Sequence, residues 1–383
     1  MKRADVVVVG GGVIGASVAY FLARQRLQVL LLERDDFAAQ ASGAAAGMLA
    51  PIAEARVDQP FLRWGLRSLA QFPPLCAELA ERTGIDPEFV EAGVLRVARE
   101  PRAARALEEQ WRCLRTLTEV LHCELEWLSA DAVLNHEPQL VHDVIGGLWS
   151  PREAHVRPRR FVEALLRAAL LWGVRLERGV AAVGILQDGE RVAGVRTTAG
   201  SCAAAHVVLC TGAWARDVEQ WLPGRVHLPI SPVRGQIVLL QPLDLSLHST
   251  LWEERVYLVP KRDGRIVVGA TQEDVGFDRR VTAGGVRDLL AAATAVVPGL
   301  ARAAFSHAWA GLRPTAPDAR PVVGPVPGVP GLCVAVGHFR NGILLAPVTA
   351  ATVADYVLGK GVDAEAGAFL PDRFAHLVPD SLS

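Results

Sequence analysis

Glycines near the start of the chain have the spacing of a dinucleotide-binding turn. Residues 10–15 have the sequence GGGVIG, which fits the pattern GxGxxG. In such a motif the first glycine permits a tight turn, the second lets a pyrophosphate approach the backbone, and the third lets helix and strand pack closely. The free N–H groups at the start of the following helix favour phosphate. The motif predicts a dinucleotide site, although a glycine turn in any α/β protein can match it.

An acidic residue follows at the distance where such sites bind ribose. Glu33 ends a second apolar run, and a carboxylate there can accept hydrogen bonds from ribose hydroxyls. The same charge disfavours a 2′-phosphate, so we expect FAD or NAD rather than NADP. These residues alone do not separate FAD from NAD.

Two further segments have the composition of a ligand-contacting backbone. Residues 42–48, SGAAAGM, carry little side-chain bulk, which lets a backbone approach a large planar ligand. Arg340 lies between Gly337 and Gly342 and is followed at once by an apolar run. An arginine is rarely buried without a partner. We therefore expect Arg340 to face an anionic ligand that is not part of the chain.

The elements that position the first motif form a βαβ unit. Residues 5–9 are an apolar β-branched run, residues 13–26 have helical apolar spacing, and residues 28–32 form a second apolar run. The uncharged stretch from residue 6 to 23 could pass for a signal peptide or a membrane span. Because glycines interrupt it, we favour strand, turn and helix, and we find no other membrane-span candidate.

The remaining chain predicts alternating helix-rich and sheet-rich segments. Expected helices cover residues 102–121, 158–172, 286–296 and 343–358, and expected strands cover 175–177, 180–186, 191–197, 206–210, 256–260, 265–269 and 332–336. Residues 313–330 are dense in proline and glycine, which predicts loop. The fold class is α/β (α+β). We expect a Rossmann-like nucleotide-binding domain from residues 1–82, 149–226 and 316–383, and a substrate domain from residues 83–148 and 227–315.

Composition excludes several classes of function. The 383 residues suggest two domains, and 51% hydrophobic residues support sizeable cores. A net charge of −1 gives no global field toward nucleic acid or an anionic membrane. The six cysteines (76, 113, 123, 202, 210 and 333) show no metal-ligand spacing. We expect them to be small buried hydrophobes in a reducing cytoplasm, with no metal site.

The motifs together resemble the D-amino-acid oxidase superfamily of flavoproteins, and most closely its glycine oxidases of the thiamine (thiazole) pathway. The matching segments are GGGVIGASVAYFLA, LLERDD, ASGAAAGMLAP, TGAW, SPVRGQIV, VYLVPKRDGRIVVGATQEDVGFD, AGLRPTAPDARPVVGP and GHFRNGILLAP. They span most of the chain from residue 6 to about 350. The resemblance implies an FAD domain of separated segments and a substrate domain with a large antiparallel sheet.

The resemblance also assigns roles to residues. Non-covalent FAD would be held by Gly10, Gly12, Val13, Ile14, Gly15, Glu33, Arg34, Ser42, Ala45, Ala46, Gly47, Met48, Val180, Thr211, Gly212, Trp214, His338, Phe339, Arg340, Asn341, Gly342, Ile343 and Leu344. Arg313 would pair with the substrate carboxylate, helped by the Tyr257 hydroxyl, with Arg340 and Met48 beside the substrate. A helix after Gly342 would direct its positive end at the flavin.

The implied reaction needs no strong side-chain base. With its amine neutral, the amino acid passes a hydride to the flavin, water hydrolyses the imine to a 2-oxo acid, and O2 reoxidises the flavin to give hydrogen peroxide. No Ser-His-Asp or carboxylate-pair arrangement is present to act as acid or base, and we expect His338 to be structural. Glycine, sarcosine and small D-amino acids are the expected substrates. Relatives are often tetramers, so a homo-oligomer is an option.

Two alternatives stay open at this stage. One is a D-amino-acid dehydrogenase that passes electrons to a quinone or another acceptor instead of O2. The other is a non-catalytic dinucleotide-binding module that serves a partner protein. Arg313 and Tyr257 favour an enzyme over the module, whereas the sequence does not separate an oxidase from a dehydrogenase.

Overall fold

One of two large sheets carries the glycine turn. The computed structural model describes residues 2–54, 59–121, 124–361 and 364–377. The first sheet has eight strands: β1 (Lys2–Val9), β2 (Val29–Glu33), β8 (Arg175–Arg178), β9 (Ala182–Asp188), β10 (Arg191–Thr197), β11 (Gly200–Leu209), β17 (Val322–Pro325) and β18 (Leu332–Val336). Its parallel part has the order β18-β11-β1-β2-β8. Strands from the start, middle and end of the chain are therefore neighbours.

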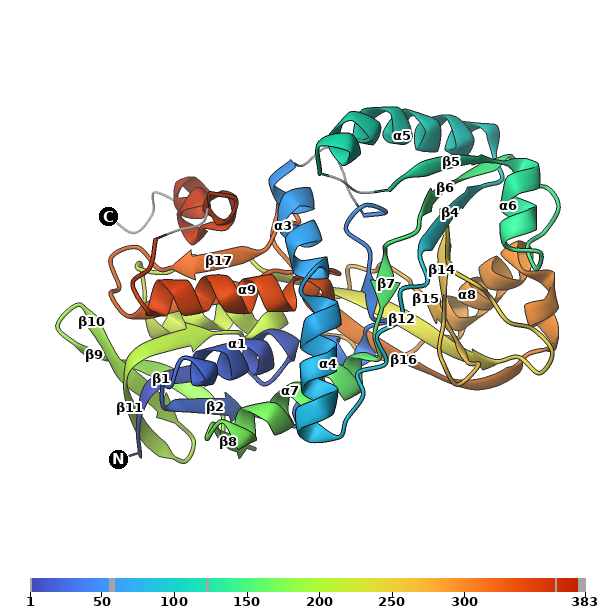
Figure 1. Ribbon diagram of the computed structural model, residues 1–383. Coiled ribbons are helices and arrows are strands. Elements are labelled where there is room, and N and C mark those ends of the chain that lie inside the picture. Colours follow the sequence, from blue (N-terminus) through green and yellow to red (C-terminus); the bar gives the residue numbers. More distant parts are fainter. Residues whose placement is uncertain (1, 55–58, 122–123, 362–363, 378–383) are drawn as a thin grey trace.

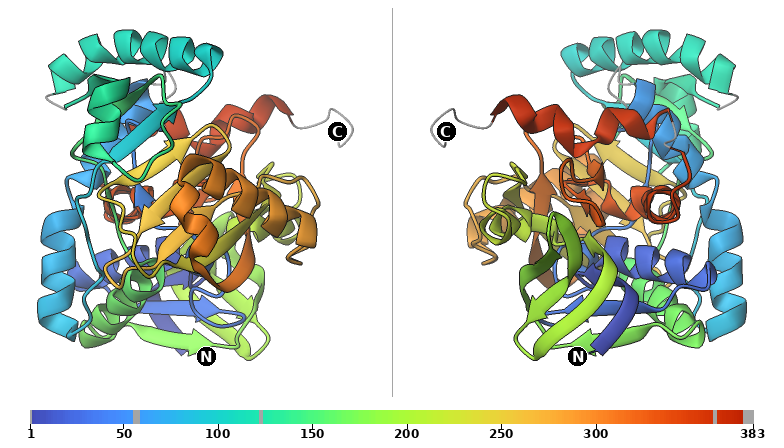
Figure 2. Two further views of the ribbon diagram at one scale, coloured as in Figure 1. Left: turned by 90° about the vertical axis from the view of Figure 1, so that its right-hand side faces the viewer. Right: turned by 90° about the vertical axis from the view of Figure 1, so that its left-hand side faces the viewer.

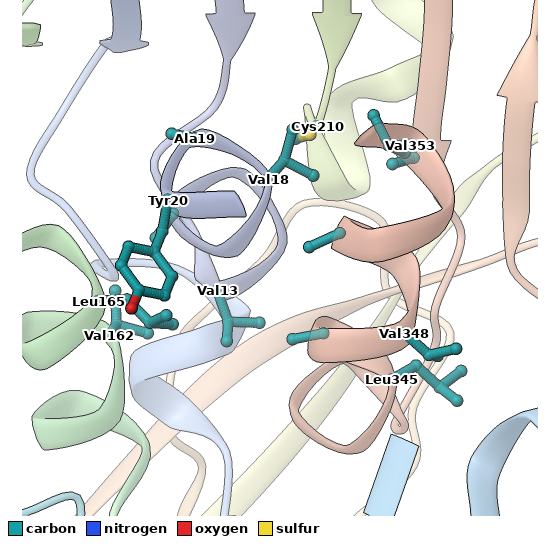
Figure 3. Close-up of a cluster of buried hydrophobic side chains, with 14 of the residues drawn as sticks. Val13, Val18, Ala19, Tyr20, Val162, Leu165, Cys210, Leu345, Val348 and Val353 are labelled. Carbon is teal, nitrogen blue, oxygen red and sulfur yellow. The ribbon is translucent and has the colours of Figure 1, made fainter. Parts of the chain in front are cut away.

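Helices cover one face of this sheet and supply its largest core. Helix α1 (Val13–Arg24) lies between α7 (Pro158–Leu171) and α9 (Gly342–Val357), as Figure 3 shows for Tyr20 beside α7 and for the valines of α9. Small residues make this close packing feasible, because α1 buries Gly15, Ala16, Ser17 and Ala19. The first turn of α1, which follows Gly12, is thus held rigidly beside the sheet.

The second sheet forms the other half of the molecule. It contains eight strands: β4 (Val94–Ala98), β5 (Glu126–Ser129), β6 (Gly146–Ser150), β12 (Ser231–Gln241), β13 (Thr250–Glu253), β14 (Val256–Pro260), β15 (Ile266–Gly269) and β16 (Ala304–Thr315). All neighbours are antiparallel except β13 and β4. Helices α5 (Pro101–Leu121), α6 (Ala130–His136) and α8 (Ala283–Val296) pack on it.

The remaining elements belong to neither large sheet. They are α2 (Ala41–Ala44), β3 (Met48–Leu49), α3 (Gln59–Leu69), α4 (Phe72–Thr83), β7 (Ala154–His155) and the 3-10 helices η1 (Gly212–Trp221), η2 (Pro298–Arg302), η3 (Ala366–Phe369) and η4 (Pro371–Leu377). In Figure 1 the first sheet with α1 and α9 lies on the left and the second sheet on the right, and the views of Figure 2 show α5 at one end of the molecule. In the described parts of the chain, no helix is both long and apolar enough to span a membrane.

The predicted fold class is confirmed, and the predicted loop over residues 313–330 is wrong in two places. Strand β16 continues to Thr315 because it pairs with β12 along its whole length. Strand β17 pairs with β18 at the edge of the first sheet, where proline is tolerated. Tertiary pairing outweighed the local preference for loop at both positions.

Two other expectations need adjustment. Cys113 is exposed, whereas Cys76, Cys202, Cys210 and Cys333 are buried as expected, and Cys123 lies outside the described residues. Strand β6 belongs to the second sheet and crosses the predicted domain boundary at 148/149. We propose that the domain division follows the two sheets, with this boundary placed after Ser150.

Candidate active site

A cavity of about 480 Å³ lies where the two sheets meet. On one side it is lined by residues at the carboxyl ends of four parallel strands: Val9, Leu32, Ala335 and Val336 at the ends of β1, β2 and β18, and Cys210 directly after β11. Ligands of open α/β sheets bind at this edge. On the other side the cavity is lined by Gly235, Ile237, Tyr257 and Arg313 of the second sheet.

The glycine turn closes the cavity at the first sheet, and its glycines are sterically required. Gly10 has a φ of +107°, and a Cβ there would lie 2.4 Å from the carbonyl oxygen of Cys210. A Cβ on Gly15 would lie 1.8 Å from the carbonyl oxygen of Gly10. No acidic residue occupies the first turn of α1. The glycines therefore let strand, turn and helix pack closely, and no acidic side chain in the first turn of α1 would repel a phosphate.

Polar groups around the turn are partly used within the protein and partly available. The Glu33 carboxylate accepts hydrogen bonds from the N–H groups of Gly11 at 2.7 Å and Asp35 at 2.8 Å, which leaves lone pairs for ribose hydroxyls. Ser42 Oγ accepts from the Val13 N–H at 2.9 Å. The Thr211 hydroxyl is buried beside the cavity with no hydrogen-bond partner among the described residues. Such an unsatisfied group favours a polar ligand in the cavity.

Donors from the second sheet hold the small-residue loop that includes α2. Trp309 Nε1 donates to the Ala44 carbonyl at 3.0 Å, and Lys261 Nζ donates to the Ala46 carbonyl at 2.7 Å and to the Val156 carbonyl at 3.0 Å. Burial lowers the pKa of Lys261 to about 7. The predicted ligand-contacting loop is thus positioned by residues more than 200 positions away, which sequence analysis did not assign to the site.

Arg313 and Tyr257 lie beside each other on the side of the cavity that the second sheet forms. Arg313 Nη1 donates to the Thr271 carbonyl at 2.9 Å, and no carboxylate forms an ion pair with this guanidinium in the described parts of the chain. Burial raises the pKa of Tyr257, an effect that the nearby Arg313 charge opposes. The Tyr257 hydroxyl therefore keeps its proton and can donate a hydrogen bond.

Glycines that face Arg313 and Tyr257 provide the space that these two side chains occupy. A Cβ on Gly235 would lie 2.3 Å from Arg313 Nη2, and a Cβ on Gly269 would lie 2.4 Å from the Tyr257 ring. Gly235 pairs with Gly311 across β12 and β16, and Gly269 pairs with Tyr257 across β15 and β14. Larger residues on these strands would displace both polar groups.

Arg340 lines the cavity, but the expectation that its partner lies outside the chain is wrong. Its Nε donates to Glu54 Oε2 at 2.6 Å. Its guanidinium also lies 5.4 Å from the ring centre of Trp252, within the range of a cation–π contact. Glu54 and Trp252 are cavity-lining residues that the sequence did not reveal, because each reaches Arg340 only through the fold.

Glu153 supports the backbone next to Glu54. Its side chain is fully buried, and its Oε1 accepts from the N–H groups of Ile52 at 2.6 Å and Ala53 at 2.9 Å. Burial raises the pKa of Glu153 to about 8, and the charge of Glu54 acts in the same direction. Glu153 is therefore a buried carboxyl group that holds the segment carrying Glu54.

The turn before α9 has the geometry of a backbone-rich ligand contact. Gly337 has a φ of +72°, which favours glycine. His338 is buried, its Nε2 lies 3.0 Å from Thr349 Oγ1, and burial lowers its pKa to about 3. A histidine with these properties is a poor proton acceptor at neutral pH, which supports a structural role.

Most of the predicted site residues border this one cavity. Gly15, Asn341 and Leu344 do not line it. Gly15 packs against the backbone of Gly10, while Asn341 and Leu344 are buried. The predicted residues that do line it are Gly10, Gly12, Val13, Ile14, Glu33, Arg34, Ser42, Ala45, Ala46, Gly47, Met48, Val180, Thr211, Gly212, Trp214, Tyr257, Arg313, His338, Phe339, Arg340, Gly342 and Ile343.

Comparison with known proteins agrees with this geometry. Residues 5–356 match the family model described as FAD dependent oxidoreductase. The chain belongs to this family. Among similar proteins, glycine oxidase of Geobacillus kaustophilus is 38% identical over 93% of both chains. The crystal structure of glycine oxidase from Geobacillus kaustophilus superimposes with a TM-score of 0.93, at 36% identity, over 97% of this chain and 99% of that one.

A longer relative is also similar. The bifunctional protein ThiO/ThiG of Trichormus variabilis is 36% identical over 97% of this chain but only 55% of its own length. The chain thus spans about half the length of that protein. The chain is thus a member of the FAD-dependent oxidoreductases and is similar to glycine oxidase.

The residues present fit FAD. Gly10 and Gly12 of the glycine turn line the cavity, Glu33 keeps free lone pairs, and Thr211, whose hydroxyl is unsatisfied among the described residues, lines the same cavity. Arg34 stacks on Trp214, with its guanidinium 3.9 Å from the ring centre. When bound, FAD supplies the electron acceptor that the side chains lack. In the described part of the chain, no group of His, Cys, Asp and Glu residues is placed to hold a metal ion.

Proposed function

We propose that the chain oxidises glycine and small amines such as sarcosine and small D-amino acids. For glycine the products are glyoxylate, ammonia and hydrogen peroxide, formed from one O2 and one water per substrate. We further propose that this activity serves thiamine (thiazole) biosynthesis, in line with the similarity to ThiO/ThiG. The Arg313 guanidinium beside Tyr257 is the single observation that carries the proposal, because it is a cation in the cavity without an acidic partner among the described residues.

The proposed roles follow from the contacts. One edge of the Arg313 guanidinium donates to Thr271, which fixes its direction and leaves other N–H groups for a carboxylate. Tyr257 adds a neutral donor, and Met48 borders the same space. A carboxylate held by two donors presents the α-carbon in one orientation toward the cofactor. We assign no acid or base role to any side chain, in agreement with the low pKa and buried position of His338.

One assay distinguishes the proposed oxidase from a dehydrogenase and from a non-catalytic module. Glycine added to the air-saturated holoenzyme without another electron acceptor should release hydrogen peroxide and glyoxylate in equal amounts. Flavin reduction without peroxide until a quinone is added would identify a dehydrogenase. A yellow protein that no amine in the panel reduces would identify a non-catalytic module.

A further inference from the structure

A second cation without an ion-pair partner among the described residues lies at the tip of the β13–β14 hairpin. Arg255 is exposed and lines the cavity, and its backbone N–H donates to Glu253 Oε2 at 2.9 Å. In the part of the chain that the structure describes, its guanidinium forms no ion pair. The other cavity arginines differ: Arg340 pairs with Glu54, and Arg34 pairs with Asp35 and stacks on Trp214. Among the cavity-lining arginines, only Arg313 resembles Arg255 in having no ion pair with any residue that the structure describes.

The hairpin register places Arg255 near the proposed carboxylate site. Trp252 pairs with Tyr257, and Glu253 pairs with Val256 on the buried face. Arg255 precedes Tyr257 by two residues, so their Cα atoms are at most about 7 Å apart. Tyr257 in turn lies beside Arg313. Arg255 and Arg313 therefore both border the cavity, and the backbones of Arg255 and Tyr257 lie close together at its second-sheet end.

We propose that this end of the cavity binds amino acids that carry a second carboxylate, with Arg255 as the specificity-determining residue. The inference rests on the proposed function, which places the first carboxylate on Arg313. An anion that reaches both cations gains a second charge-assisted contact, whereas a neutral substituent gains none. Glu254 is exposed beside Arg255 and also lines the cavity. The negative charge of Glu254 repels a second carboxylate and limits the gain in affinity that Arg255 provides.

A matched pair of amines tests this inference. Iminodiacetate and N-ethylglycine share the carboxymethylamine group, and differ by a carboxylate in place of a methyl group. We expect Arg255→Gln to lower the ratio of their kcat/KM values, iminodiacetate over N-ethylglycine, by about fivefold, the upper range for an exposed ion pair. Arg255→Lys should retain most of the ratio. Added salt should lower the ratio in the wild-type enzyme more than in Arg255→Gln. An unchanged ratio in Arg255→Gln would overturn the inference.

A binding readout separates this inference from the proposed function. Malonate and acetate can be titrated into the oxidised holoenzyme while the flavin absorbance is followed, without any turnover. We expect Arg255→Gln to weaken malonate about fivefold more than acetate. Equal weakening of both ligands would also overturn the inference. If the enzyme oxidised no amine but Arg255→Gln still weakened malonate binding more than acetate binding, the proposed function would be refuted and the second anion site would stand.

Discussion

The Arg313→Met substitution isolates the carboxylate contact. Met is similar in length but provides no donor, so the substrate carboxylate would lose its charged partner while Tyr257 remains. Loss of one partner of a buried charge pair costs about 2–5 kcal/mol. Because Arg313 is only half-buried, we expect the lower part of that range, about 2–3 kcal/mol. At 1.36 kcal/mol per factor of ten, this corresponds to a KM for glycine raised about 30- to 150-fold.

The assay separates binding from folding. FAD content and thermal unfolding should match the wild-type protein, because Arg313 forms its hydrogen bonds with the Thr271 carbonyl and Tyr257 on the second-sheet side of the cavity, away from the glycine turn. Anaerobic stopped-flow reduction at increasing glycine gives the apparent dissociation constant and the limiting rate. We expect a large increase in the dissociation constant. Arg313→Lys restores the charge but not the planar fork, and should recover part of the loss.

A second variant tests the geometry without removing the cation. In Gly235→Ala the new Cβ would lie 2.3 Å from Arg313 Nη2, so the guanidinium must move. We expect a higher KM for glycine with FAD still bound. If both Arg313→Met and Gly235→Ala kept the wild-type KM, the assignment of Arg313 to the carboxylate would be refuted.

Three further changes probe the framework of the site. Because the pKa of Glu153 is raised to about 8, the carboxyl group keeps its proton in the folded state between about pH 4.5 and 8. As pH rises through that range, the free energy of unfolding of the wild type should fall relative to that of Glu153→Gln, by at most about 1.4 kcal/mol per pH unit. A difference between the two proteins that stays constant with pH in urea unfolding would contradict this. Lys261→Met removes the donor to the Ala46 and Val156 carbonyls and should increase FAD release, measured by flavin fluorescence, whereas Lys360→Met at an exposed site serves as the control. Gly15→Ala would place a Cβ 1.8 Å from the Gly10 carbonyl and should lower both FAD content and Tm, while Gly284→Ala, which meets nothing within 4 Å, should not.

Local patterns predicted the parts of the fold that depend on neighbouring residues. Strand β1, the glycine turn and helix α1 follow from one continuous apolar and glycine pattern. The same holds for the β14–β15 hairpin around Arg262, Asp263 and Gly264. The extension of β16 was not predictable in this way, because its partner β12 is distant in sequence. Strand β17 pairs with the next strand, β18, and it was missed because its segment is rich in proline and glycine.

The candidate site shows the same limit. Motifs with a recognisable local sequence, such as the glycine turn and the segment around Arg313, supplied most cavity residues. Glu54 was missed because its contact with Arg340 spans 286 positions. Lys261 was missed as a site residue because its contact with Ala46 spans 215 positions. Two signals could have drawn attention to Lys261: it lies in the segment VYLVPKRDGRIVVGATQEDVGFD, and lysine is rare in this chain.

Anaerobic reduction of the bound flavin tests the central claim most directly. Purified yellow protein would be mixed without oxygen with glycine, sarcosine, D-alanine and D-proline in turn, and the visible flavin absorbance followed. Glycine should bleach the flavin, and admission of O2 should restore the colour with release of hydrogen peroxide. A flavin that stays oxidised with every amine of this panel would contradict the proposed amine oxidation.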